Sequence, residues 1–215
     1  LAWLNRAADP AKLPARRKAK EGTLADAGKL LREEDKETLV RMVLDWAKDD
    51  DRLHERLVLY AARHSGPAAG ADAVRRAFEE AVRVRDFVHY REASAWARGV
   101  DDAIDSMERL LTDGQAAAVI ELCESALQSL LGAIEAVDDS DGHFGVLRDR
   151  LQDIHYEACL ETRPEPADLA KRLFQWELHS DFDVFYGAAE RYAKILGAKG
   201  MKVYRELAEA EWAAV

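Results

Sequence analysis

Cysteine, proline and long apolar runs are scarce in this sequence of 215 residues, which has two cysteines and five prolines. The cysteines, Cys123 and Cys159, both fall on apolar faces of predicted helices, so a disulfide framework is excluded and a reducing compartment is favoured. No apolar run approaches the roughly 18 residues that cross a bilayer, and the N-terminus lacks the apolar core of a signal peptide. We therefore expect a cytoplasmic protein that does not bind membranes.

The sequence also lacks the short motifs that mark common enzyme classes. It contains no glycine-rich phosphate loop, no Gly-x-Ser-x-Gly elbow and no His-Glu-x-x-His pair. A reactive cysteine needs a nearby cation or a helix N-terminus, whereas both cysteines lie in the interiors of predicted helices. We therefore assign no catalytic residue, metal ligand or cofactor, and we expect a protein that is not an enzyme.

The net charge of −10 is divided unevenly along the chain. Residues 1–20 hold six basic residues and one acidic residue, or +5, so the remainder holds 25 basic and 40 acidic residues, or −15. An acidic body repels phosphate backbones, so nucleic acid is expected only indirectly or through the basic segment. We predict a basic flexible tail or linker over residues 1–22. Since the first residue is Leu1, we also expect a fragment or a processed product.

From residue 23 to residue 215 the sequence reads as consecutive amphipathic helices joined by short loops, and no stretch alternates as a strand does. Thr23 and Asp26 resemble a capping box, and Pro166 suits a first helical position. The pattern predicts nine to ten helices, no sheet, and one helical domain over 23–215. The apolar stripes place several aromatic residues on buried faces, namely Trp46, Tyr60, Trp176, Phe185 and Trp212.

Successive helix pairs suggest a repeat. The segment 192–197, Tyr-Ala-Lys-Ile-Leu-Gly, followed by Tyr204, partly resembles the tetratricopeptide pattern of a large residue, a Leu-Gly turn and a tyrosine. Tetratricopeptide arrays recur near 34 residues, whereas these helix pairs vary in length. We expect an all-α, antiparallel helix-pair α-solenoid of tetratricopeptide-like (TPR-like) type; the alternative is an irregular globular bundle.

Several segments together resemble uncharacterised bacterial all-helical proteins of tetratricopeptide-like type, some of which are associated with SWIM-type zinc fingers. The resemblance covers roughly residues 24–215 and rests on structural segments, so it implies a fold and little chemistry. Two cysteines inside helices cannot form the Cys-x-Cys and Cys-x-His cluster of such a finger. The segments that carry the resemblance are 84–96, the acidic loop Asp138-Asp139-Ser140-Asp141-Gly142, 173–178, Phe185-Tyr186 and Tyr192-Ala193.

One segment, residues 83–91, concentrates cationic and aromatic side chains in the acidic body. Arginine beside aromatic residues is enriched at protein interfaces, so Arg83, Arg85, Tyr90 and Arg91 are the candidate partner-binding residues. The alternative is an ordinary connection between helices. In that case Phe87 and Tyr90 fill the core, and the arginines pair with neighbouring carboxylates such as Glu80.

Two further clusters invite a metal interpretation. The acidic loop Asp138–Asp141 resembles a calcium loop, but aligning Gly142 with the invariant glycine removes two essential ligands. We expect instead that Asp141 or a neighbour caps the following helix. His155 and Cys159 lie four residues apart on one helix face, yet zinc needs two more ligands. We expect both to be partly buried core residues.

The sequence therefore favours a non-enzymatic protein-protein interaction or scaffolding module whose groove binds a protein or peptide. Two alternatives stay open. One is an accessory helical domain of a nucleic-acid-associated, SWIM zinc-finger-like protein that uses a lost N-terminal finger and the basic tail. The other is a metal-dependent enzyme built on carboxylates and histidines of a helical bundle.

Overall fold

The computed structural model describes residues 23–214, and these form helices joined by short loops. They contain ten helices and no strand; one isolated bridge joins Val88 to Val137. The prediction of an all-α protein with nine to ten helices is thus confirmed for the described residues. The predicted basic tail, residues 1–22, lies outside them.

The chain divides into two compact units, Leu1–His54 and Glu55–Val215, whereas the helical pattern predicts one domain over 23–215. The described part of the first unit holds α1 (Leu24–Leu31), α2 (Lys36–Asp49) and the start of α3 (Asp51–His64).

Side-chain caps define the helix starts of the first unit. Thr23 and Asp26 form the predicted capping box, with both reciprocal bonds present. The Asp35 carboxylate accepts a hydrogen bond from the backbone N–H of Thr38 at 2.9 Å, and Asp50 caps α3 in the same way. Such caps satisfy amide groups that the first helical turn leaves without partners.

Three of the aromatic residues predicted to be buried are exposed. Trp46, Tyr60 and Trp212 expose 51%, 54% and 86% of their surface, so the predicted burial is wrong for them. An apolar stripe is buried only where another element packs on it. Within the first unit, α1 and α2 do not pack extensively on each other. Within the second unit, the rest of α3, which carries Tyr60, does not pack extensively on another described helix, and Trp212 lies in the last turns of the last one.

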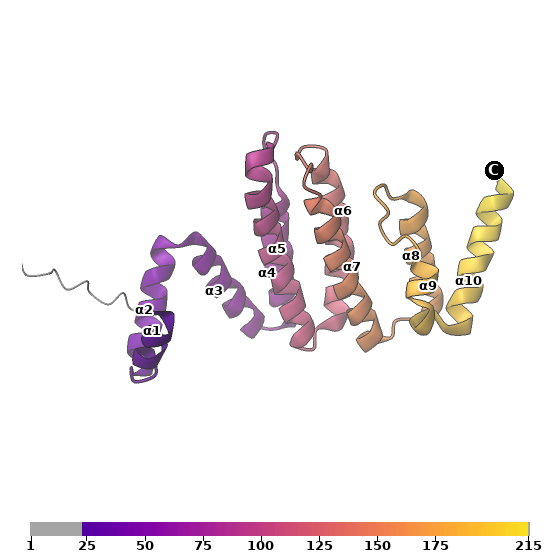
Figure 1. Ribbon diagram of the computed structural model, residues 1–215. Coiled ribbons are helices and arrows are strands. Elements are labelled where there is room, and N and C mark those ends of the chain that lie inside the picture. Colours follow the sequence, from indigo (N-terminus) through magenta and orange to yellow (C-terminus); the bar gives the residue numbers. More distant parts are fainter. Residues whose placement is uncertain (1–22, 215) are drawn as a thin grey trace, which may run out of the picture. The chain divides into compact units, whose positions relative to one another are not determined.

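The second unit contains the rest of α3 and seven further helices. After α3, the next four helices form two antiparallel hairpins, α4 with α5 and α6 with α7. The closing loops of the two hairpins lie at the same end in Figure 1. Those loops are joined by the bridge at Val88, which donates to the Ala136 carbonyl and accepts from Asp138, both at 2.9 Å. The helices are α4 (Pro67–Val82), α5 (Tyr90–Thr112), α6 (Ala116–Ile134), α7 (His143–Thr162), α8 (Pro166–His179), α9 (Ala188–Arg191) and α10 (Ala193–Ala214).

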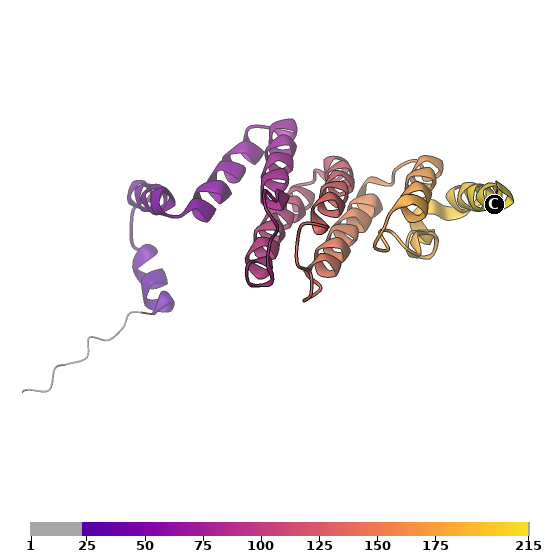
Figure 2. The same ribbon diagram turned by 90° about the horizontal axis from the view of Figure 1, so that it is seen from above.

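The core of this unit runs through both hairpins, because α4 packs on α6 as well as α5, and α5 packs on α7. Viewed from above, α4–α5 and α6–α7 stand as adjacent pairs (Figure 2). The third group differs: α8 packs on α9 and α10. Several core side chains are almost completely buried, among them Val74, Phe78, Ile104, Leu122, Leu127, Leu130, Leu151 and Leu173.

The segment between α8 and α9 is a loop that contains Phe185, which is buried as predicted but lies outside any helix. Phe182, Asp183 and Phe185 have φ of 59°, 55° and 56°, in the left-handed region that side chains disfavour. Side chains of α7 hold this backbone. Gln152 accepts from the Phe185 N–H at 2.6 Å, and Arg148 donates to the Phe182 carbonyl at 2.6 Å. Tertiary hydrogen bonds therefore override the local helical pattern.

One described helix, α6, is long and apolar enough to cross a membrane by length and composition alone. The expectation from the sequence rests on uninterrupted apolar runs, and Glu121 and Glu124 interrupt the apolar sequence of α6. For this reason the sequence does not predict that α6 is long and apolar enough to span a membrane. Its apolar residues are largely buried against neighbouring helices, and a buried core helix of that kind passes the same test.

Candidate functional site

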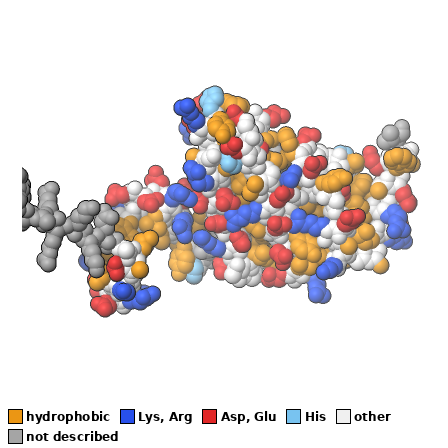
Figure 3. Space-filling view, viewed as in Figure 1, with side chains coloured by type: hydrophobic (Ala, Val, Ile, Leu, Met, Phe, Trp, Pro, Cys, Tyr) orange, Lys and Arg blue, Asp and Glu red, His pale blue; other side chains and the backbone are white. Residues whose placement is uncertain are grey.

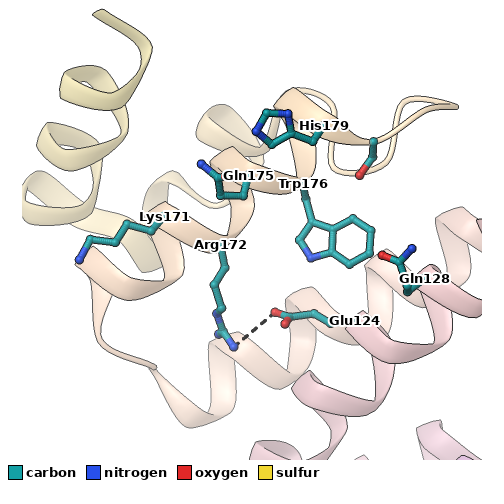
Figure 4. A pocket seen from close by; sticks show the side chains of 8 residues that line it. Glu124, Gln128, Lys171, Arg172, Gln175, Trp176 and His179 are labelled. Atoms are coloured by element: carbon teal, nitrogen blue, oxygen red, sulfur yellow. Dashed lines mark ion pairs between the residues drawn. The ribbon is translucent and has the colours of Figure 1, made fainter. Parts of the chain in front are cut away.

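A hollow of about 420 Å³ opens between α6 and α8 (Figure 4). We call it the α6–α8 groove. It exists because α6 and α8 are not packed closely against each other, unlike α4 and α6, so longer side chains occupy the space between them. The groove is lined by Glu124, Gln128, Lys171, Arg172, Gln175, Trp176, His179 and Ser180.

Trp176 lies at the centre of the groove, and its half-buried ring reaches from α8 toward α6 (Figure 4). Its inner side packs edge-on against Phe185, with ring centroids 6.0 Å apart. The amides of Gln128 and Gln175 are exposed beside it. An aromatic surface flanked by amides can contact an extended chain through both apolar area and hydrogen bonds.

Arg172 crosses from α8 to α6, where its Nη1 lies 3.4 Å from Oε1 of Glu124. The Nε atom of Arg172 is buried and has no hydrogen-bond partner. Lys171 points away from Trp176 and pairs with Asp168 at 3.6 Å, and His179 lies farther along α8 on the other side of Trp176 (Figure 4). On the face seen in Figure 3, acidic and basic side chains intermingle, so net charge alone does not mark a site there.

Behind the groove, Glu124 connects to a buried polar network. His155 of α7 is fully buried, and its Nε2 lies 3.2 Å from the same Glu124 Oε1 that contacts Arg172. Its Nδ1 lies 2.8 Å from the hydroxyl of Tyr192, which is also fully buried. Glu124 therefore links the groove to the interior of the second unit.

The partners of His155 assign its tautomer. A carboxylate only accepts, so Nε2 carries the proton and donates to Glu124, and Nδ1 accepts from the Tyr192 hydroxyl. Burial lowers the pKa of His155, although the Glu124 carboxylate acts in the opposite direction. Burial likewise raises the pKa of Tyr192. The network is thus satisfied by a neutral imidazole.

The two cysteines are buried thiols, as predicted. Burial raises the pKa of Cys159 to about 12 and raises that of Cys123 further. The Sγ of Cys159 lies 3.8 Å from Nδ1 of His155, so both are core residues, more deeply buried than expected. Among the described residues no group of three His, Cys, Asp or Glu side chains is arranged to hold a metal ion.

The predicted partner-binding residues lie at the loop end of the first hairpin, and none of them lines the groove. Arg83 pairs with Glu80 at 2.9 Å, as the alternative of an ordinary connection predicts. Arg85 and Arg91 are exposed. Tyr90 exposes 52% of its surface and donates to Asp141 at 3.2 Å, so the expectation that it fills the core is wrong.

The same expectation is wrong for Phe87, which exposes 50% of its surface. The bridge between the two hairpin loops holds the backbone at Val88 and so leaves the neighbouring side chain in solvent. In the acidic loop, Asp139 accepts from the Phe144 N–H at 3.0 Å. Asp139 thus satisfies the amide of the second residue of α7, but the N-cap residue is Gly142, which makes no side-chain cap bond, so Asp141 does not cap the helix, contrary to expectation.

Ser94, His143 and Asp141 lie close together beside a second hollow, of about 270 Å³, between α5 and α7. Ser94 Oγ is 3.2 Å from His143 Nε2, and Asp141 is 4.0 Å from that same nitrogen. A catalytic triad needs the carboxylate on the opposite ring nitrogen from the nucleophile. This arrangement therefore does not activate the serine.

The groove residues were missed because the apolar stripes assigned α6 and α8 to the core. The available signal was Glu124, a carboxylate within a strongly apolar helix, together with His155 on an apolar face. Buried polar groups need partners, so two such residues on neighbouring helices indicate a shared polar network.

The fold and the groove define an all-helical protein of packed hairpins with an open, tryptophan-centred surface groove. The chain belongs to a family of unknown function, DUF6880, whose family model matches residues 27–214. No curated protein and no solved structure matches the chain.

Proposed function

We propose that the chain is a non-enzymatic protein-interaction module built as a TPR-like helical solenoid, and that its α6–α8 groove binds an extended peptide segment of a partner. The observation that carries the proposal is the open groove itself, with Trp176 at its centre and the amides of Gln128 and Gln175 beside it.

The spacing of the hairpins supports a repeat. Their first helices begin at Pro67, Ala116 and Pro166, which are 49 (116 − 67) and 50 (166 − 116) residues apart. This period is longer than the roughly 34 residues of a tetratricopeptide array, which accounts for the loose match at the sequence level. Packing of α4 on α6 and of α5 on α7 is the neighbour-to-neighbour contact expected of stacked repeats.

Buried positions recur with the same period. The fourth, fifth and eighth residues are buried in each of the three first helices, so the same face of each helix is turned inward. These residues are Gly70, Ala71 and Val74 in α4, Val119, Ile120 and Cys123 in α6, and Leu169, Ala170 and Leu173 in α8.

The groove lies where this stacking opens. First helices pack directly at α4–α6, whereas at α6–α8 the contact is made through Arg172 and Trp176 instead. Solenoids bind partners on surfaces formed by successive repeats, and exposed aromatic anchors supply much of the binding free energy at interfaces. An opened repeat interface with a tryptophan at its centre fits a peptide better than it fits a small molecule.

Panning a random peptide library displayed on phage against the immobilised protein tests the proposal. We expect enriched peptides that bind the wild type and bind Trp176→Ala at least about tenfold more weakly. Trp212→Ala is the matched control, because that exposed tryptophan of α10 does not line the groove.

Because Trp176 packs on Phe185, the variant is compared with Gln128→Ala, whose side chain is exposed and lines the groove. Circular dichroism verifies that both variants fold. Peptides that bind the wild type, Trp176→Ala and Gln128→Ala equally well would contradict the assignment of the groove. Failure to enrich any peptide would contradict the peptide-binding function.

A further inference from the structure

We infer that the α6–α8 groove selects a carboxylate-bearing, acidic peptide segment, which Arg172 binds through its guanidinium. The inference rests on the proposed peptide-binding function and names the chemistry of the partner. Its evidence is the incomplete pairing of Arg172 and the balance of charge along the groove.

Arg172 has spare hydrogen-bonding capacity. A guanidinium has five N–H donors in a planar fork, and the contact of Arg172 in the groove is one of 3.4 Å to Glu124. Its Nε–H is buried without a partner, which is an unfavourable state for a polar group. The side chain as a whole is 40% exposed, so a carboxylate that enters the groove can reach its exposed part and form charge-assisted hydrogen bonds there.

The charge of the lining residues favours the same ligand. Lys171, which pairs with Asp168 at 3.6 Å, and Arg172 stand near one end of the groove, and His179 stands at the other, with Trp176 between them. Glu124 is the sole carboxylate among the lining residues. The lining thus holds two cationic side chains and one carboxylate, a local excess that favours acidic segments.

Glu124 competes with such a ligand. Its Oε1 atom is shared between Arg172 and the buried His155, so it neutralises the guanidinium only in part. Replacing the carboxylate by an amide removes the competing charge while keeping an oxygen that accepts from His155. Glu124→Gln is therefore expected to strengthen binding of an acidic peptide, whereas the removal of a cation such as Arg172 is expected to weaken it.

Fluorescence anisotropy with short labelled peptides tests the inference. The peptides are glutamate-rich, the same sequence with glutamine, and the same with lysine; each is made with a free and with an amidated C-terminus. We expect the glutamate peptide to bind about tenfold or more tightly than the glutamine peptide, which corresponds to about 1.4 kcal/mol. Comparing the affinities of peptides with free and amidated C-termini shows whether the groove binds a side-chain carboxylate or the terminal one.

Variants assign the selectivity to particular groups. Arg172→Gln and Lys171→Gln should reduce the preference for glutamate, while Glu124→Gln should raise it several-fold. Lys171 is 60% exposed, so its substitution should not disturb the core. Lys171→Gln therefore still tests the selectivity if Arg172→Gln fails to fold. Arg205→Gln, an exposed arginine of α10, is the matched control and should change nothing.

The outcomes separate the two proposals. Glutamate and glutamine peptides that bind equally, with both affinities lost in Trp176→Ala, would overturn the acidic selectivity and leave the peptide groove in place. A single-stranded oligonucleotide that binds through Arg172 more tightly than the glutamate peptide would also overturn it. No binding by any peptide would refute the proposed function itself.

Discussion

His155 should make the second unit less stable in mild acid. Its imidazole is fully buried and bonded to Glu124 and Tyr192, and burial lowers its pKa below the ordinary value of 6.5. The other charged groups that act on it are Arg172 and Arg191, and both also lower its pKa. As the pH falls, the unfolded chain takes up this proton before the folded protein does.

The sign and the size follow from proton linkage. Above about pH 7.5 the imidazole is neutral in both states and contributes no pH dependence. Below its unfolded pKa of 6.5, stability falls by at most about 1.4 kcal/mol for each pH unit, until the folded pKa is reached. Between about pH 7.5 and about pH 5.5, His155 alone therefore removes up to about 1.4 kcal/mol from the free energy of unfolding.

Urea denaturation monitored by circular dichroism at the two pH values measures this loss for the wild type and for His155→Gln. The glutamine amide still donates to Glu124 but does not titrate, so the variant should lose about 1 kcal/mol less than the wild type on acidification. At neutral pH the variant should be less stable by about 1–3 kcal/mol, because it leaves the buried Tyr192 hydroxyl without its acceptor. Equal acid losses in the two proteins would refute the assignment of His155 as a buried neutral imidazole.

Two glycine substitutions should act in opposite directions on the melting temperature. Gly200→Ala places a Cβ atom 2.8 Å from the Pro166 carbonyl oxygen and should destabilise by about 1–3 kcal/mol, whereas Gly99→Ala meets nothing within 4 Å on α5 and should stabilise by about 0.5–1 kcal/mol. Cys123 and Cys159 should not react with a thiol reagent in the native protein at neutral pH and should both react in denaturant, as followed by absorbance; rapid native labelling would contradict their burial.

Local rules predicted much of the fold. The Thr23 capping box and the start of α8 at Pro166 are each determined by a few neighbouring residues, and each is confirmed. The loop after α8 could not be predicted in this way. Phe185 belongs to a pattern of helical period, but its backbone is held by Gln152 from α7, a contact that the local sequence does not contain.

The candidate site depended even more on tertiary arrangement. Amphipathic periodicity shows that α6 and α8 each have an apolar face, but it does not show how closely the two helices approach. Trp176 and Arg172 occupy a groove because α6 and α8 stand apart. In the segment 83–91, which was predicted to bind a partner, the Tyr90 hydroxyl instead donates a hydrogen bond to Asp141 in the loop of the next hairpin. That hydroxyl proton is therefore already used within the protein.

In the buried network behind the groove, His155 is hydrogen-bonded to both Tyr192 and Glu124, so these residues satisfy one another without a ligand. Arg172 is the member at which this pairing ends, with a long contact to Glu124 and a buried Nε–H without an acceptor. Two further buried polar atoms of the described residues, Trp96 Nε1 and Gln115 Oε1, also lack partners, but Arg172 differs from them because it lines the groove. The groove is therefore the open end of a structural network, at which the proposed acidic partner would pair with Arg172.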